Sequence, residues 1–139
     1  IIIANEKAIK ENNLTPIARI VGSSSSGVDP AYMGIGPVPA SKKVLKNAKL
    51  SIDKMDIIEI NEAFASQVLA SMRELGINDN DQRVNPNGGA IALGHPVGAT
   101  GTILTIKAIS ELKRINAKRG LVTMCIGGGQ GIAIALEMV

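Results

Sequence analysis

Apolar positions recur with two different periods along the chain, and Gly, Pro and Asn separate the periodic segments. Short runs rich in Ile and Val predict strands, because β-branched side chains pack well on a pleated surface. Apolar residues spaced three or four positions apart, such as Phe64, Val68 and Met72, predict amphipathic helices. We expect strands at residues 17–21, 56–60, 121–126 and 132–138, and helices at 4–13, 40–49, 61–75 and 97–114.

The predicted helices connect most of the predicted strands. Such connections indicate an α/β fold with a largely parallel sheet and helices on its faces. The last two strands are joined by a short glycine turn at residues 127–131, so we expect an antiparallel hairpin that makes the sheet mixed. Residues 23–39 begin with four serines and end in Gly and Pro, which predicts a loop.

Composition narrows the possible functions. The chain has 139 residues, of which 45% are apolar, enough for one domain with its own core. Tyr32 and Phe64 are its only aromatic residues, which argues against a protein that stacks nucleic-acid bases. The net charge of +3 is too small to indicate a nucleic-acid arm or a polybasic membrane patch. No apolar run approaches the ~20 residues of a membrane span and no signal-peptide pattern is visible, so we expect a cytoplasmic protein.

Cys125 and His95 are the only cysteine and the only histidine. An internal disulfide and a zinc site of the Cys/His type are therefore excluded, and we expect neither a metal nor a cofactor. The glycine-rich segments raise the alternative of a nucleotide-binding module. A dinucleotide fingerprint would need a glycine where Ile132 stands, and a P-loop would need Lys where His95 stands. Both motifs fail, which disfavours this alternative.

Three polar side chains stand at element ends, where open α/β sheets place their sites. Asn61 can cap a helix, or its amide can hold a water or a carbonyl. His95 can be an ordinary exposed histidine, or an imidazole that exchanges protons near neutral pH. Cys125 can be an inert core thiol, or a proton donor or nucleophile. The turn at Gly127 follows it, and backbone N–H groups in such a turn can approach a small ligand closely.

Three sequence strings in this order resemble the C-terminal half of the thiolase family. They are Asn-Glu-Ala-Phe-Ala at 61–65, Gly-Gly-Ala-Ile-Ala-Leu-Gly-His-Pro-Val-Gly-Ala-Thr-Gly at 88–101 and Cys-Ile-Gly-Gly-Gly-Gln-Gly at 125–131. The resemblance extends to residues 33–40 and covers nearly all of the chain from about residue 14. It implies a mixed five-stranded sheet of the βαβαβαββ type with helices on its faces. It also implies that residues 1–15 are a helix remnant of the N-terminal half and residues 16–139 the C-terminal domain.

The resemblance also implies roles for single residues. Thiolases interconvert two acyl-CoA thioesters with a longer 3-oxoacyl-CoA and free CoA. Cys125 would take the α-proton, and His95 would activate a nucleophilic cysteine and help to hold a thioester oxygen. Asn61 would fix a water at that oxyanion site, and the backbone N–H of Gly127 would serve a second oxyanion hole.

Met33 and Phe64 would line the pocket for the acyl group and pantetheine. The family's acyl-accepting cysteine lies in its N-terminal half, whereas Cys125 matches the other catalytic cysteine. The resemblance therefore implies an acetyl-CoA C-acetyltransferase domain that is incomplete alone. Its expected partners are acyl-CoA, an N-terminal thiolase half and further copies in a dimer or tetramer. The alternative is a non-catalytic scaffold subunit of a split assembly, which would not need all three polar residues.

Overall fold

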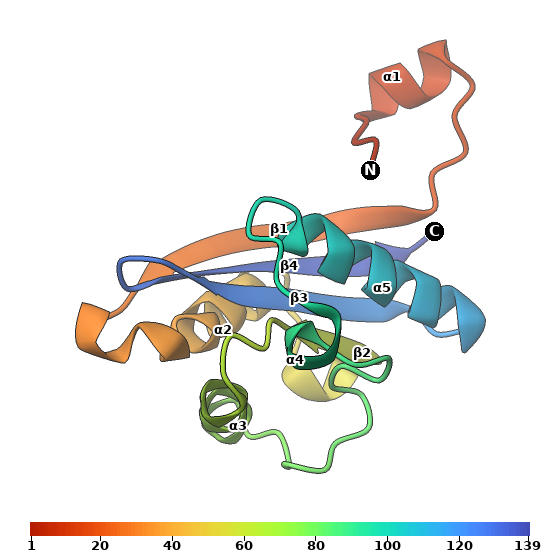
Figure 1. Cartoon of the computed structure of the whole chain (residues 1–139). Coiled ribbons are helices and arrows are strands. Elements are labelled where there is room, and N and C mark those ends of the chain that lie inside the picture. Colours follow the sequence, from red (N-terminus) through yellow and green to blue (C-terminus); the bar gives the residue numbers. More distant parts are fainter.

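The computed structural model describes residues 1–139 and contains one sheet with helices on both faces (Figure 1). The strands are β1 (Ala18–Gly27), β2 (Ile57–Ile60), β3 (Arg119–Ile126) and β4 (Gln130–Met138). The α-helices are α1 (Glu6–Glu11), α2 (Pro37–Asn47), α3 (Ala65–Glu74), α4 (Ala90–Leu93) and α5 (Thr100–Arg114), and η1 (Pro30–Ile35) and η2 (Ile52–Lys54) are 3₁₀-helices. No helix is both long and apolar enough to span a membrane.

The sheet is mixed, as predicted, but its strand number and pairing differ from the expectation. Its order is β1-β4-β3-β2, with four strands in place of five. Only β2 and β3 are parallel, because β1 lies against β4 and both pairs that include β4 are antiparallel. The α/β class and the final hairpin are confirmed, and the prediction of a largely parallel sheet is wrong.

A remnant of a fifth strand lies beyond β2. Val84 forms a single parallel bridge with Ile58 there. The chain then turns away at Asn85, whose φ of 45° is the left-handed conformation that Asn tolerates better than most residues. The Asn85 side chain replaces a strand backbone, because it accepts from the N–H of Ile60 at 2.9 Å and donates to the carbonyl of Ile60 at 2.9 Å.

The loop predicted at residues 23–39 is ordered secondary structure over most of its length. The four serines belong to β1 and pair with β4, where Ser24 lies opposite Ala133 and Ser26 opposite Gly131. The loop prediction fails here because pairing with an apolar strand outweighs the low strand preference of a serine run. α2 begins at Pro37, three positions earlier than predicted, since the fixed φ of proline suits the first turn of a helix.

Two apolar clusters cover the two faces of the sheet. β2 contributes to both because successive side chains of a strand point to opposite faces. Ile58 and Ile60 pack with α2 and α3, whereas Ile57 packs with α5. The small residues Ala133 and Ala135 on β4 and Ala108 on α5 are almost fully buried, which lets helices and sheet approach closely without aromatic side chains.

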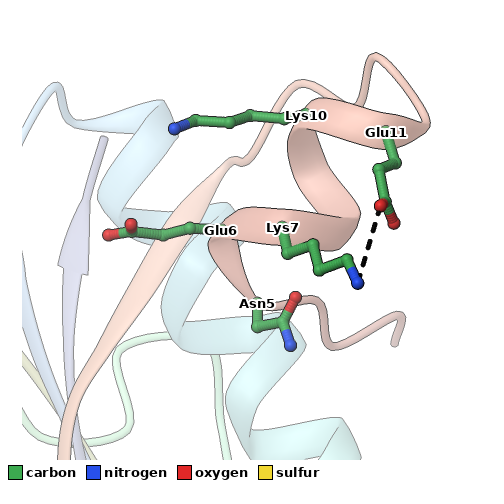
Figure 2. A pocket seen from close by; sticks show the side chains of 5 residues that line it. All are labelled: Asn5, Glu6, Lys7, Lys10 and Glu11. Atoms are coloured by element: carbon green, nitrogen blue, oxygen red, sulfur yellow. Dashed lines mark ion pairs between the residues drawn. The ribbon is translucent and has the colours of Figure 1, made fainter.

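α1 stands apart from the sheet, and none of its residues is buried (Figure 1). Figure 2 shows the shallow hollow beside it, which is lined only by polar and charged side chains of this segment. Lys7 and Glu11, one turn apart on α1, form an ion pair at 3.8 Å. None of the candidate site residues lines this hollow, so it is not the site that the motifs indicate.

Glu111 on α5 is one carboxylate that contributes to the acid dependence of the stability of the chain. It accepts from Arg114 at 2.6 and 2.8 Å and from Asn87 at 2.9 Å. These bonds, above all those from Arg114, lower the pKa of Glu111 from 4.5 to about 2. Because the folded-state pKa is the lower one, ionised Glu111 stabilises the fold above pH 4.5, and this contribution is lost as the pH falls toward 2.

We therefore expect Glu111→Gln to reduce the pH dependence of the free energy of unfolding between about pH 5 and pH 2. Urea unfolding at a series of pH values measures this. Glu74→Gln is the matched control, since Glu74 lies exposed at the end of α3. Equal pH slopes for the two variants would contradict the role of Glu111.

Candidate active site

Asn61 extends the parallel pairing of β2 by one residue. Its N–H donates to the carbonyl of Thr123 on β3 at 3.0 Å. The side chain is fully buried, and neither its amide nitrogen nor its amide oxygen has a hydrogen-bond partner. The helix-cap alternative is excluded, because α3 begins after Phe64 and no side chain caps it. An unpartnered buried amide costs about 1–3 kcal/mol, so the group is suited to a water or a ligand.

His95 lies in the exposed loop between α4 and α5, next to the first turn of α5. Its Nδ1 is 2.7 Å from the hydroxyl of Thr100, and that hydroxyl donates to the carbonyl of Pro96 at 3.1 Å. A hydroxyl has one proton, so Nδ1 is the donor to Thr100 in the neutral ring. Nε2 is then left with its lone pair and can accept a proton from a reacting group.

Cys125 is the second-last residue of β3 and lies opposite Gly131 of β4. The side chain is half-buried, and burial raises the pKa of its thiol, opposed in part by its own backbone N–H. The thiol is therefore protonated at neutral pH. A thiolate formed there is a stronger base than an ordinary one, which suits it to remove a weakly acidic proton.

The hairpin turn after Cys125 presents an unpaired donor. Gly128 and Gly129 both have a φ of 79°, which favours glycine. The N–H of Gly127 donates to no other group of the chain, and a Cβ at Gly127 would meet no atom within 4 Å. This N–H is thus free to bind a ligand oxygen.

The fold brings Asn61, His95 and Cys125 to one end of the sheet. Asn61 directly follows β2, and Cys125 lies near the end of β3, the parallel neighbour of β2. The two residues lie near the same end of the sheet because the N–H of Asn61 bonds to Thr123, two residues before Cys125. α5 starts at this end as well (Figure 1), and a Cβ on Gly101 in its first turn would contact the sulfur of Met124 at 3.8 Å. The loop with His95 therefore enters α5 beside the residue that precedes Cys125.

Met33 and Phe64 lie on two segments that pack together. Met33 is part of η1, and Phe64 is the residue before α3. Ser71 on α3 donates to the carbonyl of Gly34 at 3.5 Å, which joins the two segments. Both predicted pocket residues are exposed, at 45% for Met33 and 64% for Phe64, so neither is enclosed in a pocket of this chain.

Sequence reasoning singled out none of the residues that support this site. Thr100 sets the tautomer of His95, and the carboxylate of Glu62 binds both Asn85 and the backbone of Ile91. Glu62 does have a signal, because it is the one charged residue in the string at 61–65. The sequence around Thr100 carries no signal of its role, apart from the spacing of five residues between His95 and Thr100.

Comparisons with known proteins agree with the motifs. Residues 14–138 match the family described as "Thiolase, C-terminal domain". The chain is 53% identical over 139 residues to the beta-ketoadipyl-CoA thiolase of Pseudomonas aeruginosa and covers 35% of that relative's length. It superposes on human mitochondrial 3-ketoacyl-CoA thiolase in complex with CoA with a TM-score of 0.94 and 51% identity, covering 98% of this chain and 34% of that one.

A third comparison concerns an enzyme named for a different acyl group. The acetyl-CoA acetyltransferase of Bacillus anthracis matches with a TM-score of 0.91 and 47% identity, over 96% of this chain and 34% of that one. All three proteins are thus much longer than this chain, and all align with it over nearly its whole length. The chain belongs to the thiolase family and carries that family's C-terminal domain.

Proposed function

We propose that this chain supplies half of the active site of an acetyl-CoA C-acetyltransferase, which joins two acetyl-CoA molecules reversibly to acetoacetyl-CoA and CoA. The observation that carries the proposal is the buried, unpartnered amide of Asn61 at the same end of the sheet as His95 and Cys125. The nucleophilic cysteine would come from an N-terminal half, because Cys125 is the single cysteine of the chain and matches the other catalytic position.

In the first step the nucleophilic thiol attacks the thioester of acetyl-CoA. His95 Nε2 accepts the thiol proton and later passes it to the departing CoA thiolate. Negative charge develops on the thioester oxygen as its carbonyl is attacked. A water held by Asn61, together with the protonated imidazole, would stabilise this oxygen, and fixed donors of this kind are worth about 3 kcal/mol each.

In the second step Cys125 acts as a base. The neutral His95 imidazole would first accept the thiol proton of Cys125. The Cys125 thiolate then removes a methyl proton from a second acetyl-CoA, and the resulting enolate attacks the acetyl group on the nucleophilic cysteine. A carbon–carbon bond forms, the acyl–sulfur bond breaks, and the nucleophilic thiolate leaves and takes the proton back from His95. The free N–H of Gly127 next to Cys125 would stabilise the charge on an oxygen of this step.

The choice of acyl group rests on η1, which carries the predicted pocket residue Met33. η1 has the sequence Pro-Ala-Tyr-Met-Gly-Ile and contains no Lys or Arg. A short apolar acyl group would fit such an uncharged segment, whereas a dicarboxylic acyl chain would need a cation for its distal carboxylate. The second candidate substrate is nevertheless 3-oxoadipyl-CoA, favoured by the names of relatives that are 53% and 56% identical.

A fusion protein tests the proposal, in which this chain replaces the matching segment of the Pseudomonas aeruginosa relative. We expect the fusion protein to cleave acetoacetyl-CoA with CoA, and to do so with a higher kcat/KM than for 3-oxoadipyl-CoA. The unmodified relative is the control for the N-terminal half. A preference for 3-oxoadipyl-CoA would overturn the acyl-group assignment. Absence of any thiolysis would favour the non-catalytic scaffold.

A further inference from the structure

We propose that Glu62 is a positioning residue, which holds the segment that carries His95 against the end of the strand that carries Asn61. Its effect on catalysis rests on the function proposed above, but its contacts all lie within this chain. One carboxylate oxygen accepts from the side-chain nitrogen of Asn85 at 3.0 Å, and the other accepts from the backbone N–H of Ile91 at 3.0 Å. Glu62 thereby joins three separate segments of the chain.

Gly89 makes room for this carboxylate. It is buried, it immediately precedes α4, and a Cβ built on it would overlap with all three carboxylate atoms of Glu62. The carboxylate therefore occupies the space that any other residue at this position would fill. The close approach explains why a glycine stands here although its φ of −135° is open to every residue.

The Asn85 contact fixes the backbone next to Asn61. The Asn85 amide bonds both polar backbone groups of Ile60, and its remaining donor reaches Glu62. The backbone N–H of Asn61 is held from the other side by Thr123. Residues 60–62 are thus bonded along both edges, and this fixes the direction in which the buried Asn61 amide leaves the strand.

The Ile91 contact matters because α4 has little else to hold it. None of its four residues is buried, and Ile91 and Leu93 are 65% and 63% exposed. α4 is followed by Gly94, with a φ of 89°, and then by His95. The bond from Glu62 is therefore the main polar link between this segment and the rest of the domain, only four residues before the imidazole.

Other contacts hold the preceding turn independently of Glu62. Lys107 on α5 donates to the carbonyl of Gly88 and pairs with the buried Glu59 at 2.9 Å. Asn87 donates to Glu111. Loss of the Glu62 contacts should therefore release α4 and the His95 loop locally, while the turn remains on α5 and the fold persists.

The test is Glu62→Gln in this chain, with Glu74→Gln as the control. A glutamine keeps one accepting oxygen and has an NH2 group in place of the other, so at least one of the two bonds is lost. The remaining bond is weaker because the negative charge is gone. We expect the amide proton of Ile91 to exchange with solvent about tenfold faster, and the His95 ring resonances to shift in the NMR spectrum. The melting temperature should stay close to that of the control.

Gly89→Ala serves as a second variant, because the added methyl group would displace the Glu62 carboxylate while Glu62 keeps its charge. It should change the Ile91 exchange and the His95 resonances in the same way. In the fusion protein, both variants should lower kcat about tenfold and leave KM nearly unchanged. Ile91 exchange and His95 resonances equal to those of Glu74→Gln would overturn the proposal. These NMR results stand even if the unmodified fusion protein is inactive, which would refute the proposed function alone.

Discussion

Cys125→Ser in the fusion protein is expected to lower the rate of condensation about 1,000-fold and to leave acylation of the nucleophilic cysteine within about tenfold of normal. The reason is that Cys125 would act only in the second step. A serine hydroxyl is a far weaker acid than a thiol, so at neutral pH it supplies almost no base for the methyl proton of acetyl-CoA. His95 and Asn61, which would serve the first step, are untouched by the change.

Rapid-quench mass spectrometry with acetyl-CoA separates the two steps. The acetylated protein should accumulate in a burst, and acetoacetyl-CoA should form slowly. Met124→Leu is the matched control, since it changes the half-buried neighbour of Cys125 with little change in volume. If acylation and condensation fall together in Cys125→Ser, the residue is not the base of the second step.

Gly131→Ala is expected to destabilise the chain by about 3 kcal/mol or more. A Cβ at this position would overlap with the backbone of Gly36, and a Cβ on Gly36 would overlap with the backbone of Gln130. Both partners are backbone, which cannot move aside as a flexible side chain does. The substitution would force η1, which carries Met33, away from the hairpin at Gly131, the residue opposite Cys125.

Thermal and urea unfolding of this chain measure the loss. Gly98→Ala is the control, because a Cβ at Gly98 meets no atom within 4 Å and this glycine lies in an exposed loop. An unfolding free energy for Gly131→Ala equal to that of the control would show that η1 does not pack on the hairpin as described. Such a result would also remove the structural basis for placing η1, which carries Met33, against the hairpin that contains Cys125.

Local sequence patterns predicted most elements of this fold and the final hairpin, but not the other strand pairings. The hairpin around the turn at Gly127 was predictable because two apolar runs flank five residues that include four glycines. The length of β1 was not, because its serines are held in the sheet by β4, more than a hundred positions later in the chain. The bridge at Val84 was equally hidden, since its backbone hydrogen bonds join Arg83 and Asn85 to Ile58, which lies much earlier in the chain.

The candidate site, like the fold, was predictable from the sequence only in part. Asn61, His95 and Cys125 were predictable as candidates because each is a reactive or amide side chain at an element end, and the fold places all three at one end of the sheet. Their catalytic roles stay predictions. The contacts that orient them, from Thr100 and Glu62, arise only when segments distant along the chain or across a turn meet, so no local pattern indicates them.

The most direct test of the central claim is thiolysis of acetoacetyl-CoA by CoA, measured for three samples. They are this chain alone, the Pseudomonas aeruginosa relative without the matching segment, and the two together. We expect turnover only in the mixture, and its loss when the chain carries Cys125→Ser. Turnover by this chain alone, or a mixture that is inactive or indifferent to Cys125→Ser, would contradict the account.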